Sequence, residues 1–226
     1  MRLAAPGTLT VAADYSYPPF AFRGPDGGLT GFEVELVEAV AKEMKVEARF
    51  VNRGAGALMT GLLAHRHDLA ASGLRATPTL REEGCVSAPY LGADLGILVP
   101  KANPHTVEAA TDLAGLTVAV LDGSEAERWA LGRLDRSTIA SLPATDDLLT
   151  ALQQERADAL VADLPFARFT QERSPAFTLA GRIDTTDGYV FVASKDNGPL
   201  IAQVDEAVSK LKGSGVFRKL ERRWFG

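Results

Sequence analysis

Few of the 226 residues are suited to covalent or metal chemistry, because the chain contains only one cysteine and three histidines. The single Cys85 excludes an internal disulfide. His65 and His67 are two positions apart, so they do not share a helix face, and no further Cys or His stands beside them. We interpret these two as a solvated helix end rather than a zinc site, and we expect no catalytic group, metal or cofactor.

Several other signatures are missing. There is no Walker loop and no Gly-x-Ser-x-Gly nucleophile elbow. The segment GAGALMTG holds Met59 where a dinucleotide loop has its third glycine, and we interpret it as a backbone turn. No run of about 18 apolar residues is present to span a bilayer. Because MRLAAPGTLTV lacks the apolar stretch of a signal peptide, we expect either a cytoplasmic protein or one whose leader has been removed.

The charge is mildly acidic, with 24 Lys and Arg against 29 Asp and Glu and a net charge of −5. A general electrostatic attraction to nucleic acid or to an anionic membrane is therefore not expected. The 46% of apolar residues is sufficient for a buried core. These features favour a folded protein with a small-molecule partner.

Short apolar runs alternate with longer amphipathic segments, which is typical of an α/β fold with parallel strands. The predicted strands are Leu9–Ala13, Val46–Val51, Asp68–Ser72, Leu95–Val99, Leu116–Leu121, Thr138–Leu142, Ala157–Ala162, Phe177–Ala180 and Tyr189–Ala193. A helix is predicted from Phe32, with Glu33 away from its apolar face. The Pro-Asp-Gly-Gly turn before it predicts a hairpin. The basic C-terminal segment predicts a helix that covers a core through Val216, Leu220 and Trp224.

Two phrases occur twice in the chain. LTVAAD from Leu9 returns as LTVAVLD from Leu116, and TGLLAHRHDLAAS from Thr60 matches TALQQERADALVA from Thr150 at Thr, Leu, Arg and Asp. We predict two similar βαβ halves. Ligands of such sheets bind at the carboxyl ends of the strands. The residues expected at these ends, lining one cleft, are Asp14, Ser72, Gly73, Asp122, Gly123 and Asp163.

The segment SGLRATPTLREE indicates an anionic ligand group. The planar guanidinium of Arg75 or Arg81 matches a carboxylate through two hydrogen bonds, and main-chain N–H groups near Gly73 add donors. The alternative is that both arginines are solvated and paired with Glu82 and Glu83.

Asp163 also allows two interpretations. It stands just before a predicted helix that begins at Leu164, where it caps the helix, receives a ligand ammonium group, or does both. Among the aromatic residues that follow Asp14, alternate ones are expected in the core and the others as walls of a ligand pocket.

The whole chain resembles the type-two periplasmic solute-binding proteins of ABC transporters (solute-binding protein family 3), in the branch that binds polar amino acids. The matching segments, in order, are YPPFAF, GFEVELVEAVAKEM, LLAHRHDLAASGLRATPTLRE, SAPYL, DLAGLTVAVLDGS, LQQERADALVAD and GSGVFRKLERRWFG. The resemblance implies two α/β lobes with parallel-rich sheets, residues 1–93 with 189–226 and residues 94–188. Two crossover strands, near 92–99 and 187–193, would form the hinge.

The resemblance also implies a set of ligand contacts. Asp14 and Asp163 fall where family members hold the α-ammonium group or order the cleft, and Gly123 with Ser124 place a helix N-terminus beside the α-carboxylate. The other implied contacts are Tyr17, Phe20, Ser72, Gly73, Arg75, Thr77 and Arg81.

Two departures from the family pattern bear on the ligand. In Gly-x-Thr/Ser-x-Thr-x-x-Arg, Arg75 replaces the first hydroxyl residue, and Arg81 stands one position late, with Leu80 at the expected place. The aromatic residue expected near Ala55 is missing. These changes suit an extra acidic group or a smaller polar ligand.

The resemblance implies a non-enzymatic, monomeric protein on the periplasmic or extracellular face of the membrane, delivering an amino acid to the permease of an ABC importer. Two alternatives remain. The same fold resembles cyclohexadienyl or arogenate dehydratases, which need a carboxylic acid beside arginines for the substrate carboxylates. The second alternative is that the chain is the ligand-sensing domain of a receptor.

Overall fold

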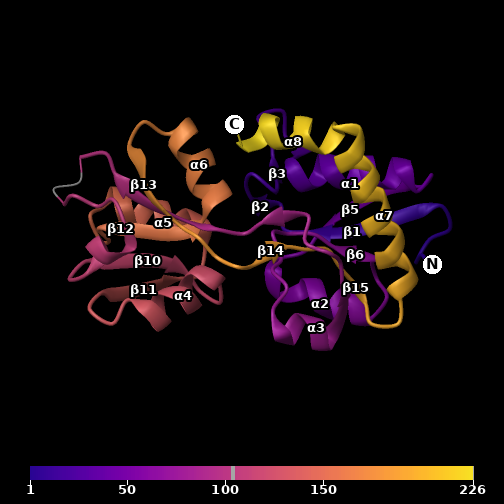
Figure 1. Ribbon diagram of the computed structural model, residues 1–226, viewed down its shortest axis with the longest axis horizontal. Coiled ribbons are helices and arrows are strands. Elements are labelled where there is room, and N and C mark those ends of the chain that lie inside the picture. The colour runs from indigo at the N-terminus through magenta and orange to yellow at the C-terminus, as the bar shows by residue number, and fades with distance from the viewer. Residues whose placement is uncertain (103–104, 226) are drawn as a thin grey trace. The chain divides into compact units, whose positions relative to one another are not determined.

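The computed structural model describes residues 1–102 and 105–225, and the chain divides into two compact units. The first comprises Met1–Gly92 and Asp187–Gly226, and the second comprises Ala93–Thr186. Each unit contains a five-stranded mixed sheet flanked by helices (Figure 1). The expected α/β class with helix-flanked sheets is confirmed.

The sheet of the first unit has the order β5-β1-β6-β15-β7. Its strands are β1 (Thr8–Ala13), β5 (Glu47–Asn52), β6 (Leu69–Ala70), β7 (Gly84–Val86) and β15 (Val192–Ser194). β1 pairs in parallel with both β5 and β6, whereas β15 runs antiparallel to β6 and β7. The carboxyl ends of β1 and β6 therefore lie at one edge of the sheet.

Helices cover both faces of this sheet. α1 (Phe32–Glu43), α7 (Gly198–Ser214) and α8 (Val216–Phe225) lie on one side, and α2 (Ala55–Leu63) and α3 (Pro78–Glu83) lie on the other (Figure 1). Neighbouring residues of β1 point to opposite faces, as alternation requires: Ala12 packs with Leu58 and Leu62 of α2, and Ala13 packs with Val34 of α1. This sheet is therefore buried on both faces.

Two small sheets complete the first unit. β2 (Ser16–Tyr17), β3 (Ala21–Arg23) and β4 (Leu29–Thr30) form antiparallel pairs, which confirms the predicted hairpin. β8 (Leu91–Gly92) pairs with β14 (Gly188–Tyr189) in antiparallel fashion. The chain leaves the first unit directly after β8 and has just re-entered it before β14.

The sheet of the second unit has the order β11-β10-β12-β9-β13. Its strands are β9 (Leu95–Pro100), β10 (Thr117–Leu121), β11 (Thr138–Leu142), β12 (Ala159–Asp163) and β13 (Phe177–Ile183). β10 is parallel to β11 and β12, and β9 is antiparallel to β12 and β13. The helices are η1 (Ala110–Leu113), α4 (Glu125–Arg133), α5 (Thr145–Gln153) and α6 (Leu164–Arg173).

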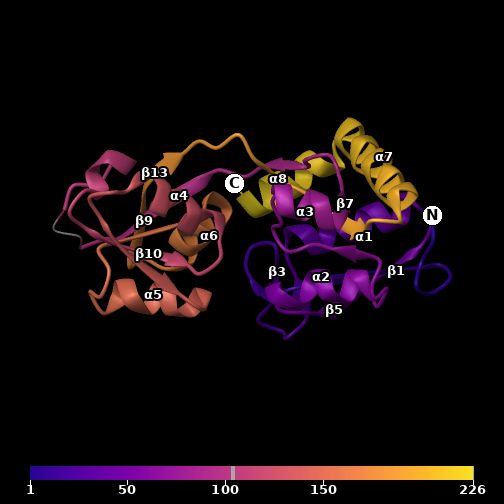
Figure 2. The same cartoon turned by 90° about the horizontal axis from the view of Figure 1, so that it is seen from below.

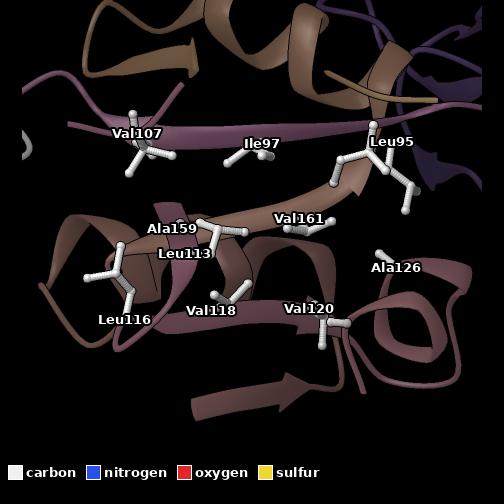
Figure 3. Packing of buried hydrophobic residues seen from close by; sticks show 13 residues of the cluster. Leu95, Ile97, Val107, Leu113, Leu116, Val118, Val120, Ala126, Ala159 and Val161 are labelled. Carbon is white, nitrogen blue, oxygen red and sulfur yellow. The ribbon is translucent and has the colours of Figure 1, made fainter. Parts of the chain in front are cut away.

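Alternation along β10 builds two cores, one on each face of this sheet. Val118 and Val120 pack with Ala126 of α4 in a cluster that also takes in Val161 of β12 (Figure 3). Ala119 points the other way, into a cluster with residues of α5 and α6. Figure 2 shows α4 and α5 on opposite sides of β10. The second unit is thus wound on both faces like the first.

The predicted repeat is confirmed and extends to the backbone. His65 and Glu155, at matching positions of the second repeated phrase, both have positive φ, of 50° and 55°. Three residues later, Asp68 accepts a hydrogen bond from the Thr10 amide at 2.8 Å. Its counterpart Asp158 accepts one from the Thr117 amide, also at 2.8 Å. Each phrase therefore makes one turn and ties it to the strand that contains the other repeated phrase of its unit, β1 or β10.

Some predicted bounds are wrong for local reasons. The strand predicted over Asp68–Ser72 spans only Leu69–Ala70. At its two ends side chains take part in the hydrogen bonding: Asp68 accepts from the Thr10 amide of β1, and Ser72 accepts from the amide of Asp14, which follows β1. The strand predicted over Tyr189–Ala193 is divided between β14 and β15. The prediction of a backbone turn for GAGALMTG is wrong, because Gly54 is the N-cap of α2 and the rest of the segment lies in that helix.

The predicted C-terminal helix is present, but its buried face differs from the prediction. Phe217 is the buried residue of α8, whereas Val216 is 36% exposed. Phe217 and Phe225 pack against Phe32 of α1, with ring centroids 5.8 and 4.7 Å apart. The helix therefore covers α1 through phenylalanines that the four-residue spacing did not include.

Candidate functional site

Asp14 and Ser72 come together at the carboxyl ends of β1 and β6. The Asp14 amide donates to Ser72 Oγ at 3.1 Å. Asp14 Oδ1 accepts from the amide and the hydroxyl of Ser16, at 2.9 and 2.5 Å. This carboxylate is therefore held by its own turn at the strand end, partly exposed.

Gly73 follows Ser72 in a conformation that only glycine adopts without strain. Its φ is 60°, and a Cβ at this position would lie 2.8 Å from Tyr17 Cε1. Its amide donates to both carboxylate oxygens of Glu33, each at 3.1 Å. The Gly73 N–H is thus engaged by Glu33 and is not one of the main-chain donors predicted near this position.

Glu33 is the residue of this region that sequence reasoning missed. Helical periodicity places it away from the apolar face of α1, yet it is only 1% exposed. Its carboxylate also accepts a hydrogen bond from the Tyr90 hydroxyl. Burial raises the pKa of Glu33 to about 7, although the hydrogen bonds from Tyr90 and Gly73 act in the opposite direction. The only indication of this role in the sequence was an acidic residue next to Phe32, in the first turn of the predicted helix.

The aromatic residues divide between core and surface. Phe20 is fully buried, and its ring lies 5.5 Å from Tyr17 in a stacked pair and 4.8 Å from Tyr189 edge-on. Tyr17 is partly exposed. Of the two aromatic residues predicted to contact a ligand, only Tyr17 therefore has solvent-exposed ring surface, and the buried Phe20 packs against its ring.

Arg75 is not the solvated surface residue of the alternative interpretation. It is 8% exposed, and its guanidinium carbon lies 5.4 Å from the centroid of the Tyr189 ring. Thr77 caps α3, because its hydroxyl oxygen accepts from the Leu80 amide at 3.2 Å. Arg81 is exposed in the last turn of that helix. The segment thus contains one buried and one exposed guanidinium.

In the second unit, Asp163 ends β12 and occupies the N-cap position of α6. Its side chain makes no capping hydrogen bond to that helix. It is 9% exposed and lies opposite Leu95 of β9. Asp163 therefore occupies the N-cap position of α6 without making the capping hydrogen bond. Its nearly buried carboxylate lies at the end of β12.

Gly123 and Ser124 form the N-terminal end of α4, but their groups are engaged within the chain. Gly123 has a φ of 71°, and its amide donates to Glu127 Oε2 at 2.9 Å. Ser124 Oγ accepts from the Glu127 amide at 3.2 Å. The hydroxyl of Ser141 also donates to Glu127, and these hydrogen bonds lower its pKa. The helix N-terminus predicted at Gly123 and Ser124 is present, but the Gly123 N–H is engaged by Glu127.

Two further residues singled out from the sequence, Asp122 and His67, differ in their exposure. Asp122 is exposed, and its amide donates to the Leu142 carbonyl at 2.9 Å. His67 is 2% exposed, with Nε2 2.9 Å from the Leu58 carbonyl oxygen, and burial lowers its pKa. Its interpretation as part of a solvated helix end is wrong. Within residues 1–102 and 105–225, no group of three or more His, Cys, Asp and Glu could hold a metal ion.

The candidate groups therefore form two sets, one in each unit. The first unit carries a partly exposed ring, a buried guanidinium and an acid at a strand end, and the second carries the nearly buried carboxylate of Asp163. Cationic and anionic groups of this kind complement a zwitterion. None of the helices over the described residues is long and apolar enough to cross a membrane.

Known proteins match this chain over almost its whole length. The model of the bacterial extracellular solute-binding proteins, family 3, matches residues 9–226. The L-cystine-binding protein TcyJ of Escherichia coli K12 is 28% identical over 221 residues, which cover 97% of this chain and 83% of that protein. An ancestral arginine-binding protein bound to arginine shares 26% identity at a TM-score of 0.87, covering 97% and 99% of the two chains.

A further solved structure bears on the enzyme alternative. It is an ancestral amino acid-binding protein, AncCDT-1, described as a precursor of cyclohexadienyl dehydratase. It shares 29% identity with this chain at a TM-score of 0.86, covering 97% and 96% of the two chains. This neighbour is itself a binding protein. The relatives are substrate-binding transport proteins, which is consistent with a chain that is not an enzyme.

Proposed function

Because the chain belongs to the bacterial extracellular solute-binding proteins of family 3, we propose that it captures a polar amino acid and delivers it to the membrane permease of an ABC importer. The observation that carries this proposal is Asp163, a nearly buried carboxylate at the end of β12. The protein acts as a monomer on the periplasmic or extracellular face of the membrane.

We propose the following contacts with the ligand. Asp163 receives the α-ammonium group, and the exposed guanidinium of Arg81 receives the α-carboxylate. Tyr17 covers the ligand side chain. Main-chain groups of Ser72, together with the first turn of α4 at Ser124, complete the contacts. Family members carry a hinge between two lobes, and we propose that residues 91–93 and 186–188 serve as this hinge.

Arg75 narrows the proposed ligand class. In a low-dielectric site a buried guanidinium repels a ligand side chain that carries a positive charge, and it attracts one that carries a carboxylate. Asp14, at the end of β1, suits a second ammonium group. L-cystine carries a second ammonium and a second carboxylate, and it is the ligand named for one relative. We therefore propose a ligand with an additional acidic or zwitterionic group, such as L-cystine or L-glutamate.

A thermal-shift screen tests the proposed function. A ligand that binds only the folded state stabilises it by about 2.7 kcal/mol at a hundredfold excess over its dissociation constant. We expect L-cystine or L-glutamate to raise the melting temperature more than L-arginine or L-lysine, and L-leucine to have no effect. A shift produced by L-leucine and by neither acidic ligand would contradict the proposed ligand class.

A further inference from the structure

Glu33 touches two segments that the proposed function makes important, the loop after β6 and the segment before β8. We propose, on the basis of the proposed function, that Glu33 is a positioning residue whose ionised carboxylate holds the Ser72–Gly73 loop in its binding conformation. Protonation of Glu33 then weakens this hold and lowers the affinity for the amino acid.

The first contact fixes the loop itself. Both oxygens of Glu33 lie 3.1 Å from the Gly73 amide nitrogen. Gly73 has a φ of 60° and leaves no room for a Cβ beneath the Tyr17 ring. On the other side of the same peptide unit, Ser72 Oγ accepts from the Asp14 amide. A shift of Gly73 therefore displaces the Tyr17 ring and the turn at Asp14, both of which are proposed ligand contacts.

The second contact reaches the segment through which the chain leaves the first unit. The Tyr90 hydroxyl donates to Glu33 Oε1, and Tyr90 directly precedes β8. The Tyr90 amide donates to the Tyr189 carbonyl at 2.9 Å, and its ring stacks on Phe191 with centroids 4.6 Å apart. One buried carboxylate thus joins the candidate binding loop to the strand that ends at the unit boundary.

The charge of Glu33 is what makes this hold strong. A carboxylate accepts charge-assisted hydrogen bonds, which are about twice as strong as neutral ones. A protonated Glu33 carries an O–H that needs an acceptor, so the Tyr90 hydroxyl must turn from donor to acceptor, and the remaining oxygen offers Gly73 only a neutral hydrogen bond.

The charged groups on the neighbouring elements have their own contacts. On α1, Glu35 pairs with Arg223 of α8 at 3.1 Å. Beyond the loop, Arg75 lies over the Tyr189 ring, and Asp14 is bound to Ser16. Tyr90, from the segment before β8, is the titratable group that contacts the Glu33 carboxylate directly.

Nuclear magnetic resonance tests the contact without any ligand. We expect the amide proton of Gly73 to move downfield between pH 5.5 and 8.5 in a single step with a midpoint near 7, as Glu33 ionises. In Glu33→Gln the same resonance should not titrate. In Tyr90→Phe the midpoint should rise, because a hydrogen bond that favours the charged form is lost. A Gly73 resonance that does not titrate in the wild type, or that titrates equally in Glu33→Gln, would overturn the proposal.

Calorimetric titration with L-cystine tests the consequence for binding. The ionisation of L-cystine is the same for both proteins, so the ratio of wild-type to Glu33→Gln affinity isolates the effect of Glu33. We expect this ratio to rise about threefold to tenfold between pH 6 and pH 8, as a neutral hydrogen bond becomes charge-assisted. A constant ratio would refute the proposal. If L-cystine binds to neither protein, the same comparison is made with L-glutamate, and the absence of binding for both contradicts the proposed ligand class, while the Gly73 titration still decides the positioning role. If Glu33→Gln does not fold, the comparison of wild type with Tyr90→Phe decides it.

Discussion

Replacing Asp163 by alanine lowers the affinity for the amino-acid ligand at least a hundredfold. The substitution leaves the ligand ammonium group buried without its partner, and the loss of one member of a buried ion pair costs about 3–5 kcal/mol. Asp163 is 9% exposed and makes no capping hydrogen bond to α6, so its removal takes no such bond from the helix. Calorimetric titration with the amino acid that gives the largest thermal shift measures the effect.

Two variants serve as controls for this prediction. Asp163→Asn keeps the shape and removes the charge, and it should bind nearly as weakly as Asp163→Ala. Asp122 lies just beyond β10 in the same unit and is exposed, so Asp122→Ala should bind like the wild type. Unchanged affinity in Asp163→Ala, with a native circular dichroism spectrum, would contradict the role assigned to this residue.

The free energy of unfolding should carry a pH dependence from Glu33 that is opposite to that of most paired acids. Its pKa is about 7 in the folded protein, against 4.5 without burial. The folded chain therefore holds a proton that the unfolded chain has lost at intermediate pH. Protonation stabilises the folded state fully below about pH 4.5, and this contribution disappears as the pH rises through 7. A difference of this size corresponds to about 3 kcal/mol.

Urea denaturation of wild type and Glu33→Gln between pH 4.5 and 8 measures this contribution. The stability of the wild type relative to the variant should fall by about 3 kcal/mol over this range and then level off. Glu43→Gln, an exposed substitution on the same helix, should differ from the wild type by less than about 0.5 kcal/mol throughout. A wild-type advantage over Glu33→Gln that does not change with pH would show that Glu33 is not buried in this way.

Local patterns predicted much of the fold. The strand predicted over Thr138–Leu142 coincides with β11, because apolar alternation and the flanking turns are properties of neighbouring residues. The internal repeat was equally readable, since Asp68 and Asp158 make the same turn within their own units. Strand ends were less predictable where a side chain replaced a main-chain partner, as Ser72 does for the Asp14 amide.

The groups of the candidate site depend on contacts between distant parts of the chain. Glu33 is buried because Gly73 and Tyr90, 40 and 57 positions away, supply its hydrogen bonds. Arg75 is buried in part because its guanidinium packs over the ring of Tyr189, a residue from the last third of the sequence. Helical periodicity and local charge contain no information on such pairs. Sequence patterns could therefore place most of the strands but could not show which N–H groups at the strand ends are hydrogen-bonded within the chain.

Isothermal titration of the purified protein with L-cystine, L-glutamate and L-arginine, alongside their Nα-acetyl derivatives, tests the central claim most directly. The account predicts saturable binding of one molecule per chain for at least one of the free amino acids. It also predicts no binding of the acetylated form of that amino acid, because the acetyl group removes the positive charge that Asp163 receives. Absence of binding for every free amino acid, or equal affinity for the acetylated compound, would contradict the claim that this chain is an amino-acid-binding protein.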